Sequence, residues 1–378
     1  MQLTHGIARQ IVARAMKIIQ FSVNVMDENG LIIGSGDPSR INQRHEGAIL
    51  ALAEHRIVEI HAKSDLKGVK PGINLPILHN GKTIGVVGIS GPPDQVHQYG
   101  ELVRMTAEMI VEQAALMAQV QWTKRHREEL VLQLIEGSTL SEQQLYSVAE
   151  QLEMDLSVPR VAAILKVSPR KDEIVSLDHL REVVQMLEFP ERNNLVGIAS
   201  VAQSEIVVLK PVTLDEHGWS RDQEEKRIAQ LMQRIREQAD YKVRIAVGDF
   251  YPGLSGLSHS YRTALATLRA TPAGKKVMFY QDHILSVTLS GVDKWRKQQL
   301  TDPLERLRQQ DPRHMLEKTL GVFFEQNCDL AQTCQKLHIH RNTLRYRLDK
   351  IEQITSLKFN NINDKTHLYL AVIALKQH

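Results

Sequence analysis

The sequence predicts a multidomain α+β protein that ends in an all-helical domain. Its 378 residues are too many for one ordinary hydrophobic core, which indicates two or three domains. Strand and helix patterns alternate through the middle of the chain, and only helical patterns follow them. We therefore expect three domains, which span residues 1–136, 137–311 and 312–378.

The composition is that of a soluble globular protein. Apolar residues make up 42% of the chain and charged residues 24%. No apolar run approaches the roughly 18 residues of a membrane span, and the N-terminus lacks the apolar core and cleavage site of a signal peptide. Cys328 and Cys334 have no partners at metal-site spacing, so we interpret them as reduced core thiols. We expect a cytoplasmic protein without a metal or cofactor.

The first 100 residues follow the order helix, hairpin, helix, hairpin. The two hairpins are expected around the turn sequences "DENG" and "HNGK". The four elements are expected at residues 6–19, 22–37, 41–55 and 72–91. One face of the first helix is expected to carry Ile7, Ile11, Ala15 and Ile18. This order of elements indicates a small sensor domain of the PAS-like or Cache-like kind.

Two glycine-containing loops of this region, "GSGDPSR" and "GISGPPD", form a candidate site for a small anion. Glycines let backbone N–H groups converge on an anion. Pro38 is placed to open a helix that carries Arg40, Arg44 and His45. The alternative is that these loops are ordinary turns, in which Arg40 and His45 are solvated or cap a helix.

A long helical pattern spans residues 100–137 and links the first domain to the second. Its apolar residues do not keep a strict heptad, which weakens a coiled-coil interpretation. Two alternatives remain. Either one long helix connects the domains and pairs with a second subunit, or two shorter helices fold back on each other.

The middle region alternates strands and helices, which is typical of a layered α/β domain. Strands are expected at residues 160–167, 194–201, 205–211, 242–250 and 275–280. Helices are expected between them at residues 178–189, 224–238 and 260–270. The dipeptide Gly248-Asp249 at a strand end is interpreted as a turn, because no second acid accompanies it to form a two-metal site.

The segments "NCDLAQTCQKL" and "HRNTLRYRL" near the C-terminus predict a helix-turn-helix. Asp329 is a plausible N-cap for the first helix, whose apolar face carries Leu330, Cys334 and Leu337. A break at residues 338–340 separates it from the second helix. That helix has His340 at its N-cap and an apolar stripe made of Leu344, Leu348 and Ile351.

The other faces of the second helix are dense in hydrogen-bond donors. At about 100° per residue, Asn342, Arg345, Tyr346 and Asp349 lie opposite the stripe, with Thr343, Arg347 and Lys350 along one flank. Residues 330–378 carry a net charge of +5, whereas the rest of the chain sums to −2. Arginine and asparagine read base edges, and the remaining donors hold phosphates. We therefore expect contacts to double-stranded DNA from Arg341, Asn342, Thr343, Arg345, Tyr346, Arg347 and Lys350. The alternative is a solvated amphipathic helix.

Three stretches resemble a known family. "HRNTLRYRL" resembles the C-terminal helix-turn-helix of PucR-type and sugar-diacid regulators, and "VGDFYPGLSGLSHSYRTALATL" resembles their GGDEF-like middle domain. The segments at residues 11–50 and 68–110 resemble the sugar-diacid recognition domain of the carbohydrate diacid regulator family. This resemblance covers nearly the whole chain in order. In it, the middle domain lacks the Gly-Gly-Asp-Glu-Phe turn of true cyclases and is degenerate.

The resemblance implies a bacterial transcriptional activator of genes for the use of glucarate, galactarate and glycerate. Such an acid is the expected effector, and a homo-oligomer on an operator is the expected assembly. Arg40 is then the best candidate for a carboxylate clamp, because its guanidinium can bind a carboxylate bidentately. Further ligand contacts are expected from His45, Ser35, Asn74 and Ser90, and from the backbone N–H groups of Gly36 and Gly91.

Two other functions are the alternatives to this one. A DNA-binding protein that responds to no ligand is favoured if the first domain is empty. An enzyme that handles nucleotides through the middle domain is disfavoured, because no nucleophile-base pair, phosphate-binding loop or metal-ligand cluster stands at usable spacing. We therefore expect no enzyme activity.

Overall fold

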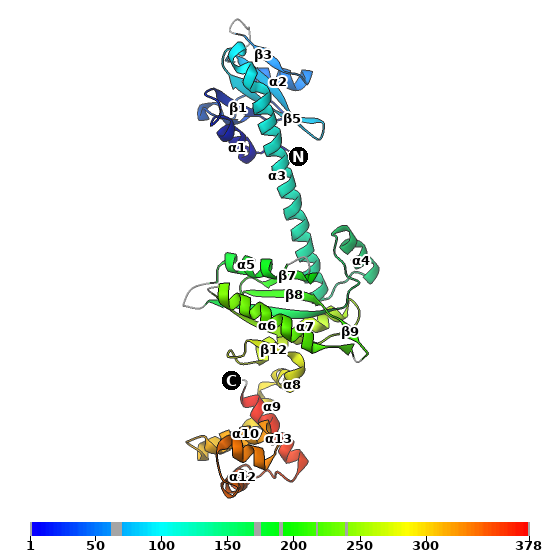
Figure 1. Cartoon of the computed structure of the whole chain (residues 1–378), viewed down its shortest axis with the longest axis vertical. Helices are drawn as coiled ribbons and strands as arrows, with labels where there is room; N and C mark the ends of the chain where they lie inside the picture. The colour runs from blue at the N-terminus through cyan, green and yellow to red at the C-terminus, as the bar shows by residue number, and fades with distance from the viewer. Residues whose placement is uncertain are drawn as a thin grey trace. The chain divides into compact units, whose positions relative to one another are not determined.

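The chain is described here by a computed structural model (Figure 1). It describes residues 2–61, 70–169, 175–188, 192–216, 218–238 and 241–376. Internal contacts divide the chain into two compact units, Met1–Arg125 and His126–His378. Among the helices of the described residues, none combines the length and the apolar character that crossing a lipid bilayer requires.

The first unit is built on a five-stranded antiparallel sheet in the order β2-β1-β5-β4-β3. Its strands are β1 (Ser22–Met26), β2 (Ile32–Ser35), β3 (Val58–Ile60), β4 (Gly72–His79) and β5 (Lys82–Ser90). Both predicted hairpins are confirmed. The β4–β5 turn uses Asn80 and Gly81, both at positive φ, as a two-residue turn of type I′ requires.

Helices cover both faces of this sheet. They are α1 (His5–Ala15), α2 (Glu46–Glu54) and the start of α3 (Pro93–Glu136). One face packs on α1 and α3 through a core that includes Ile11, Leu75, Val87 and Ile110. The other face packs on α2 through a smaller core of Met26, Ile32, Ala48, Ala51 and Val86. Alternate residues of each strand therefore serve different cores.

Ile18 does not lie on the buried face of the first helix, so that prediction is wrong. α1 ends at Ala15, and the Ile18 side chain is 62% exposed while Ile19 is buried. The helical spacing that placed Ile18 stops where the helix ends.

The prediction that Pro38 opens the helix carrying Arg40, Arg44 and His45 is also wrong. Pro38 opens a single turn of 3-10 helix, η1 (Pro38–Arg40). Asn42 then adopts a positive φ of 67°, which a right-handed helix cannot contain. Arg44 forms an isolated β-bridge, and His45 is the N-cap of the separate helix α2.

The long helical pattern is one continuous helix, α3, of 44 residues. The alternative of two helices that fold back is therefore wrong. Val103, Ala107 and Ile110 of α3 belong to the core of the first unit. Leu130 and Leu134 belong to a core of the second unit.

The first part of the second unit is a layered α/β domain with a five-stranded sheet in the order β12-β11-β6-β8-β7. The strands are β6 (Arg160–Pro169), β7 (Leu195–Ser200), β8 (Glu205–Pro211), β11 (Tyr241–Val247) and β12 (Val277–Phe279). β12 is parallel to β11, and the other pairs are antiparallel. A short ribbon pairs β9 (Leu214–Asp215) with β10 (Gly218–Trp219). All five predicted strands of this domain are confirmed.

Helices lie on both faces of this second sheet, as Figure 1 shows. α5 (Leu177–Leu187) and α6 (Arg221–Gln238) cover one face. α4 (Glu142–Gln151), α7 (Gly256–Ala270) and the last turns of α3 cover the other. The three predicted helices are confirmed, although Phe189, the last residue of one prediction, lies outside the described residues.

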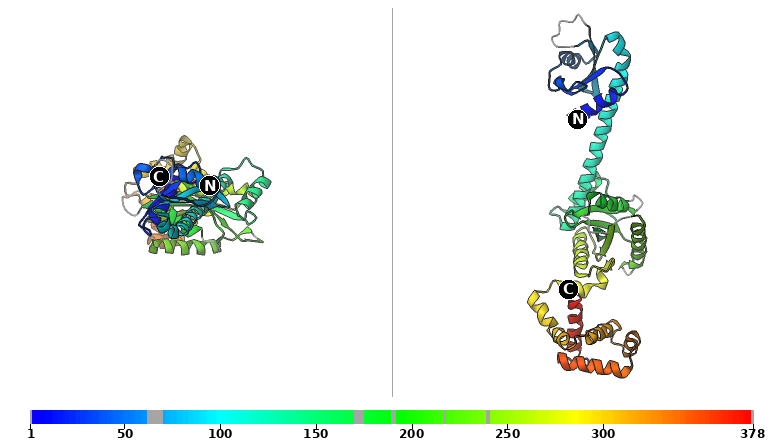
Figure 2. Two further views of the ribbon diagram at one scale, coloured as in Figure 1. Left: turned by 90° about the horizontal axis from the view of Figure 1, so that it is seen from above. Right: turned by 90° about the vertical axis from the view of Figure 1, so that its left-hand side faces the viewer.

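The end of the chain is all-helical, as predicted (Figure 2). After η3 (Tyr280–Asp282) the helices are α8 (Ile284–Ser290), α9 (Lys294–Gln310), α10 (Met315–Glu325), α11 (Leu330–Leu337), α12 (Arg341–Thr355) and α13 (Ile362–Leu375). A shared core joins α9, α10, α12 and α13 through Leu304, Leu307, Leu320, Leu344, Ile351 and Leu368. Cys328 and Cys334 are free thiols that pack against this core.

Candidate DNA-reading and ligand-binding sites

The predicted helix-turn-helix is made by α11 and α12. The Asp329 carboxylate accepts a hydrogen bond from the Gln332 N–H at 2.9 Å and caps α11. α11 ends at Leu337, and its C-cap His338 has a φ of 54°, which breaks the helix. The Nδ1 atom of His340 accepts from the Asn342 N–H at 3.3 Å, so this histidine is the N-cap of α12, as predicted.

The two faces of α12 are divided as the sequence predicts. Leu344, Leu348 and Ile351 are buried in the helical core, whereas the Tyr346 side chain is 67% exposed. The side chains of Arg341, Asn342, Thr343, Arg345 and Lys350 are exposed as well. Six of the seven residues predicted to contact DNA therefore present their side chains to solvent.

Arg347 differs from these six residues because its side chain is half-buried. Its guanidinium donates a hydrogen bond to Thr319 Oγ1 of α10 at 3.1 Å. Arg347 thus holds α12, the expected DNA-reading helix or reader helix, to α10. At the far end of α12, Glu352 accepts from the Phe359 N–H at 2.7 Å and from Lys358 Nζ at 3.3 Å, which fixes the following turn.

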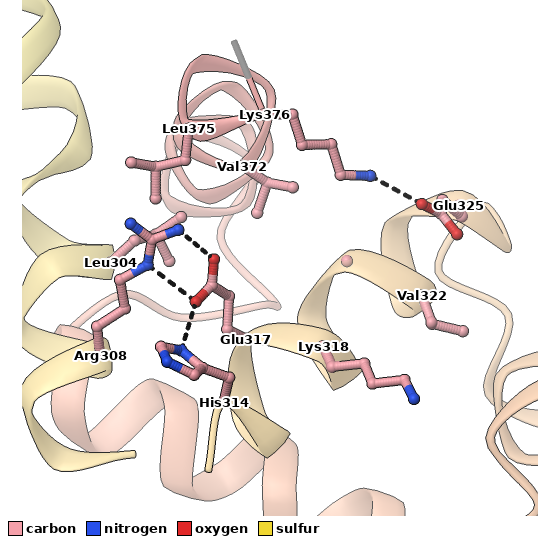
Figure 3. A pocket seen from close by; sticks show the side chains of 11 residues that line it. Leu304, Arg308, His314, Glu317, Lys318, Val322, Glu325, Val372, Leu375 and Lys376 are labelled. Carbon is pink, nitrogen blue, oxygen red and sulfur yellow. Dashed lines mark hydrogen bonds and ion pairs between the residues drawn. The ribbon is translucent and has the colours of Figure 1, made fainter. Parts of the chain in front are cut away.

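A cavity of about 510 Å³ lies between α9, α10 and α13, and α12 contributes none of its lining residues (Figure 3). Arg308 donates two hydrogen bonds to the Glu317 carboxylate, at 2.9 and 2.6 Å, across one edge of it. Arg308 therefore holds the pKa of Glu317 below its ordinary value. Lys376 and Glu325 form an ion pair of 2.7 Å on the opposite side. These pairs join α10, on which Arg347 rests, to α9 and α13.

In the first unit, four residues from four strands form one row across the sheet. Asn24 of β1 stands opposite Ser35 of β2 and opposite Gly88 of β5, and Gly88 stands opposite Asn74 of β4. Residues directly opposite on antiparallel strands point to the same face. This polar row, Ser35, Asn24, Gly88 and Asn74, lies on the face that α2 covers, because Met26 and Val86 two residues away pack on α2.

Most of the polar row is buried, but its hydrogen bonding is uneven. Ser35 Oγ donates to Asn24 Oδ1 at 2.6 Å and accepts from the Asp37 N–H at 3.0 Å. Asn24 and Asn74 are only 1% and 2% exposed. Asn74 Oδ1 is buried and has no hydrogen-bond donor within the part of the chain that the structure describes. A buried acceptor without a donor costs stability, so this atom is a candidate ligand contact.

His45 lies beside this row, because its ring and Asn74 Nδ2 both approach Gly47. His45 Nδ1 accepts from the Ala48 N–H at 3.2 Å, which caps α2 and leaves the proton of the neutral ring on Nε2. Burial, and to a smaller extent the positive charge of Arg40, lowers the pKa of His45 to about 4. His45 is therefore a neutral donor near pH 7, and Arg40, a half-buried residue, is close enough to lower its pKa.

The remaining predicted ligand residues lie at the edge of this arrangement. Ser90 stands in the neighbouring row, opposite Gly72 and Ser22. The Gly36 N–H donates to Val23 O at 3.0 Å, and the Gly91 N–H donates to Pro71 O at 2.8 Å. Both backbone groups predicted to bind an anion therefore already have acceptors.

Asn24 is a residue of the row that the sequence prediction missed. It is the polar residue in the middle of the apolar strand "SVNVM". A polar side chain at an inward position of a buried strand was a usable signal, because such a group needs a partner.

In the middle domain, the Gly248-Asp249 dipeptide lies directly after β11, at the strand end where the sequence predicts a turn. Asp249 accepts from Gln281 Nε2 at 3.1 Å and from the Phe250 N–H, as a turn residue does. No cluster of three or more His, Cys, Asp or Glu side chains suited to a metal ion occurs in the described residues.

Three family models match the chain in succession. The model described as "putative sugar diacid recognition" matches residues 3–134, and the "GGDEF-like domain" matches residues 136–270. The "PucR C-terminal helix-turn-helix domain" matches residues 316–374. The first match includes the polar row, and the third includes α11 and α12.

Relatives match the chain along its length. The carbohydrate diacid regulator of Escherichia coli (strain K12) is 40% identical over 375 residues, which cover 97% of this chain and 96% of the relative. An uncharacterized protein of Haemophilus influenzae is 42% identical over 99% of both chains. The DNA-binding transcriptional activator AdeR of Bacillus subtilis is 25% identical over 90% of this chain and 82% of its own. The chain therefore belongs to the carbohydrate diacid regulator family of DNA-binding regulators.

Proposed function

We propose that this protein is a transcriptional activator that an organic acid switches on. The effector is a sugar diacid, such as glucarate or galactarate, or glycerate, and the controlled genes serve the uptake and catabolism of these acids. The observation that carries this proposal is the row of buried polar groups beside Arg40 and His45, in the segment that matches a sugar-diacid recognition model. The name of the Escherichia coli relative supports it.

Each of the three expected domains has its own role in this proposal. Residues 1–136 act as the sensor, of PAS-like or Cache-like type, since the order helix, hairpin, helix, hairpin supports that assignment. Residues 137–311 couple the sensor to the reader without catalysis, and residues 312–378 bind the operator. Within the reader, Asn342 and Arg345 contact bases, while Thr343, Tyr346 and Lys350 contact phosphates.

Arg341 and Arg347 complete the DNA-contacting set, in two different ways. Arg341 is the first residue of α12 and is exposed at the end that a helix-turn-helix directs toward bases. Arg347 contributes through position, because its hydrogen bond to Thr319 fixes the angle of α12.

The functional unit of this proposal is a homodimer that pairs through α3. Five apolar residues of α3 lie within about 60° around the helix axis: Leu102, Met105, Met109, Leu116 and Val120. All five are exposed, and they face away from Val103, Ala107 and Ile110, which pack on the sheet. Their spacing of three, four and seven residues is that of a two-helix seam, although Glu112 and Gln119 interrupt it. A second copy presents the same stripe and can cover it.

Thermal unfolding of the full chain tests the sensor proposal. The protein is heated with glycerate, glucarate, galactarate or a neutral sugar, and the series is repeated with Arg40→Ala. An acid that binds the folded state at 100 times its Kd stabilises it by about 2.7 kcal/mol, so one acid is expected to raise Tm. The Arg40→Ala variant is expected to lose most of that shift, because the carboxylate loses its clamp. If no acid shifts Tm at millimolar concentration, the effector class is wrong.

A further inference from the structure

Gly321 lies in the interior of α10, where a glycine is unfavourable. It stands in the middle of the 11 residues of that helix. Glycine weakens a helix interior relative to alanine, because it loses more backbone freedom on folding. A Cβ atom at Gly321 would meet no atom of another element within 4 Å among the described residues. Packing inside the described chain therefore does not require a glycine here.

The open space beside Gly321 belongs to the cavity between α9, α10 and α13 (Figure 3). Its volume of about 510 Å³ lies within the range of small-molecule sites. One wall is apolar. Leu304 of α9 is fully buried there and Val372 of α13 is 8% exposed, and Val322 and Leu375 extend the same wall. An apolar group placed in the cavity would lose contact with water along this wall.

Five Lys, Arg and Glu side chains surround the apolar wall, and four of them are paired. Arg308 neutralises Glu317 at 2.6 Å, and Lys376 neutralises Glu325 at 2.7 Å. Lys318 also lines the cavity, and it forms no ion pair with any residue that the structure describes. The cavity thus carries one positive charge without a counter-charge, which favours an anion over a neutral or cationic ligand.

We propose that this cavity binds a small monocarboxylate with an apolar body, of the kind of a short-chain fatty acid. The hydrocarbon chain lies against the apolar wall beside Gly321, and the carboxylate pairs with Lys318. A sugar diacid is excluded, because its hydroxyl groups would meet that wall without hydrogen-bond partners. The ligand therefore differs in class from the effector of the first unit, and the inference goes beyond the proposed function. The site lies on α10, whose Thr319 holds Arg347 of the reader helix.

The first test uses isothermal titration calorimetry of the full chain with hexanoate, hexan-1-ol and hexylamine. Burial of the five carbon groups beyond the carboxylate is expected to give hexanoate a Kd on the order of 1 mM. We expect hexan-1-ol to bind at least about fivefold more weakly and hexylamine more weakly still, because neither pairs with a cation. Equal affinities for the three compounds overturn the proposal, and so does no binding of hexanoate at about ten times this Kd. Neither result bears on the acids of the first unit.

The second test fills the cavity. Gly321→Leu is expected to weaken hexanoate binding at least about tenfold. It is also expected to raise the Tm of the ligand-free chain, because leucine favours a helix and its Cβ meets no neighbour. Arg40→Ala is expected to bind hexanoate as the unmodified chain does, which separates this cavity from the first unit. Equal hexanoate affinity in Gly321→Leu means that the acid binds elsewhere and contradicts the proposal.

The third test removes the unpaired charge. Lys318→Gln is expected to bring the affinities for hexanoate and hexan-1-ol within about twofold of each other. Lys336→Gln is the matched control, since it removes an exposed lysine of α11 that does not line the cavity, and it is expected to keep the discrimination. Discrimination that persists in Lys318→Gln contradicts the assignment. If Gly321→Leu does not fold, this pair of variants decides.

Sedimentation equilibrium of Gly321→Leu tests the other possible occupant, a side chain of a second copy. The dimer Kd is expected to equal that of the unmodified chain, because a small acid and not a second copy fills the cavity. A dimer Kd that rises at least about tenfold means that a second copy occupies it, and overturns the proposal.

Discussion

Helix α12 and the polar row of the first unit use similar side chains in opposite ways. On α12 the polar groups are neighbours in sequence, exposed to solvent and without ties to the core, except for Arg347. In the first unit they come from three strands, are mostly buried, and are partly bonded to each other. A surface that reads a large polyanion needs exposed donors, whereas a site for a small acid must exclude water.

Helix α3 differs from both α12 and the polar row, because the stripe that it exposes is apolar rather than polar. If this stripe is covered by a second copy, Met109→Glu places two like charges in the seam and is expected to raise the dimer Kd by at least a hundredfold. Sedimentation equilibrium measures this change. Gln121→Glu adds the same charge on another face of α3 and serves as the control.

A further variant makes the dimer prediction sharper. Glu112→Leu removes an interruption of the seam and is expected to tighten the dimer. A monomer for the unmodified chain at micromolar concentration contradicts the pairing through α3.

Burial in the sensor predicts a specific dependence on pH. The pKa of His45 is about 4 in the folded chain and 6.5 ordinarily, so the unfolded chain binds its proton first as pH falls. The stability that neutral His45 contributes is complete above pH 6.5 and is lost between pH 6.5 and about 4. The expected loss is up to about 3 kcal/mol in the free energy of unfolding.

Urea unfolding at pH 7.5, 5.5 and 4.5 measures that loss against a matched variant. His45→Asn keeps a good N-cap for α2 and removes the titrating ring. The difference in free energy between the two proteins is expected to change with pH only in this window. A difference that stays constant from pH 7.5 to 4.5 means that His45 is not buried as a neutral ring.

Exposure on the reader helix predicts two separable effects on DNA binding. Arg345→Ala is expected to cost about 1–3 kcal/mol on the preferred operator and less on other sequences, because it removes a base contact. Lys350→Ala is expected to weaken all sequences alike and to reduce the salt slope by about one, because it removes a phosphate contact. Binding-site selection followed by titration at several salt concentrations distinguishes them. Equal losses from both variants on every sequence show that the assigned base-reading face is wrong.

The reader could be predicted almost completely from the sequence because its information is local. The caps Asp329 and His340, the buried stripe and the exposed donors all lie within one stretch of about 25 residues, where helical spacing assigns faces. Only the hydrogen bond from Arg347 to Thr319, which joins residues 28 apart, was beyond that reasoning.

The sensor site could be predicted only in part because it is assembled from distant residues. Ser35, His45 and Asn74 were found by their chemistry, but their alignment with Asn24 depends on strand register, which the sequence did not specify. The prediction that one helix runs from Pro38 to His45 is wrong because Asn42 turns the chain at a positive φ. In the middle domain, alternation of apolar residues sufficed to place all five strands.

The strand register of the first sheet has a consequence for how the protein matures. A slip of one residue along β4 would turn Asn74 to the face that packs on α1 and α3, and would bring Ile73 or Leu75 beneath α2. A chain folded in the wrong register would therefore have a sheet without the buried polar row. If the proposed effector binds only the native pairing, it stabilises correctly folded chains over slipped ones, and the inducer then acts on this protein as a selective folding aid.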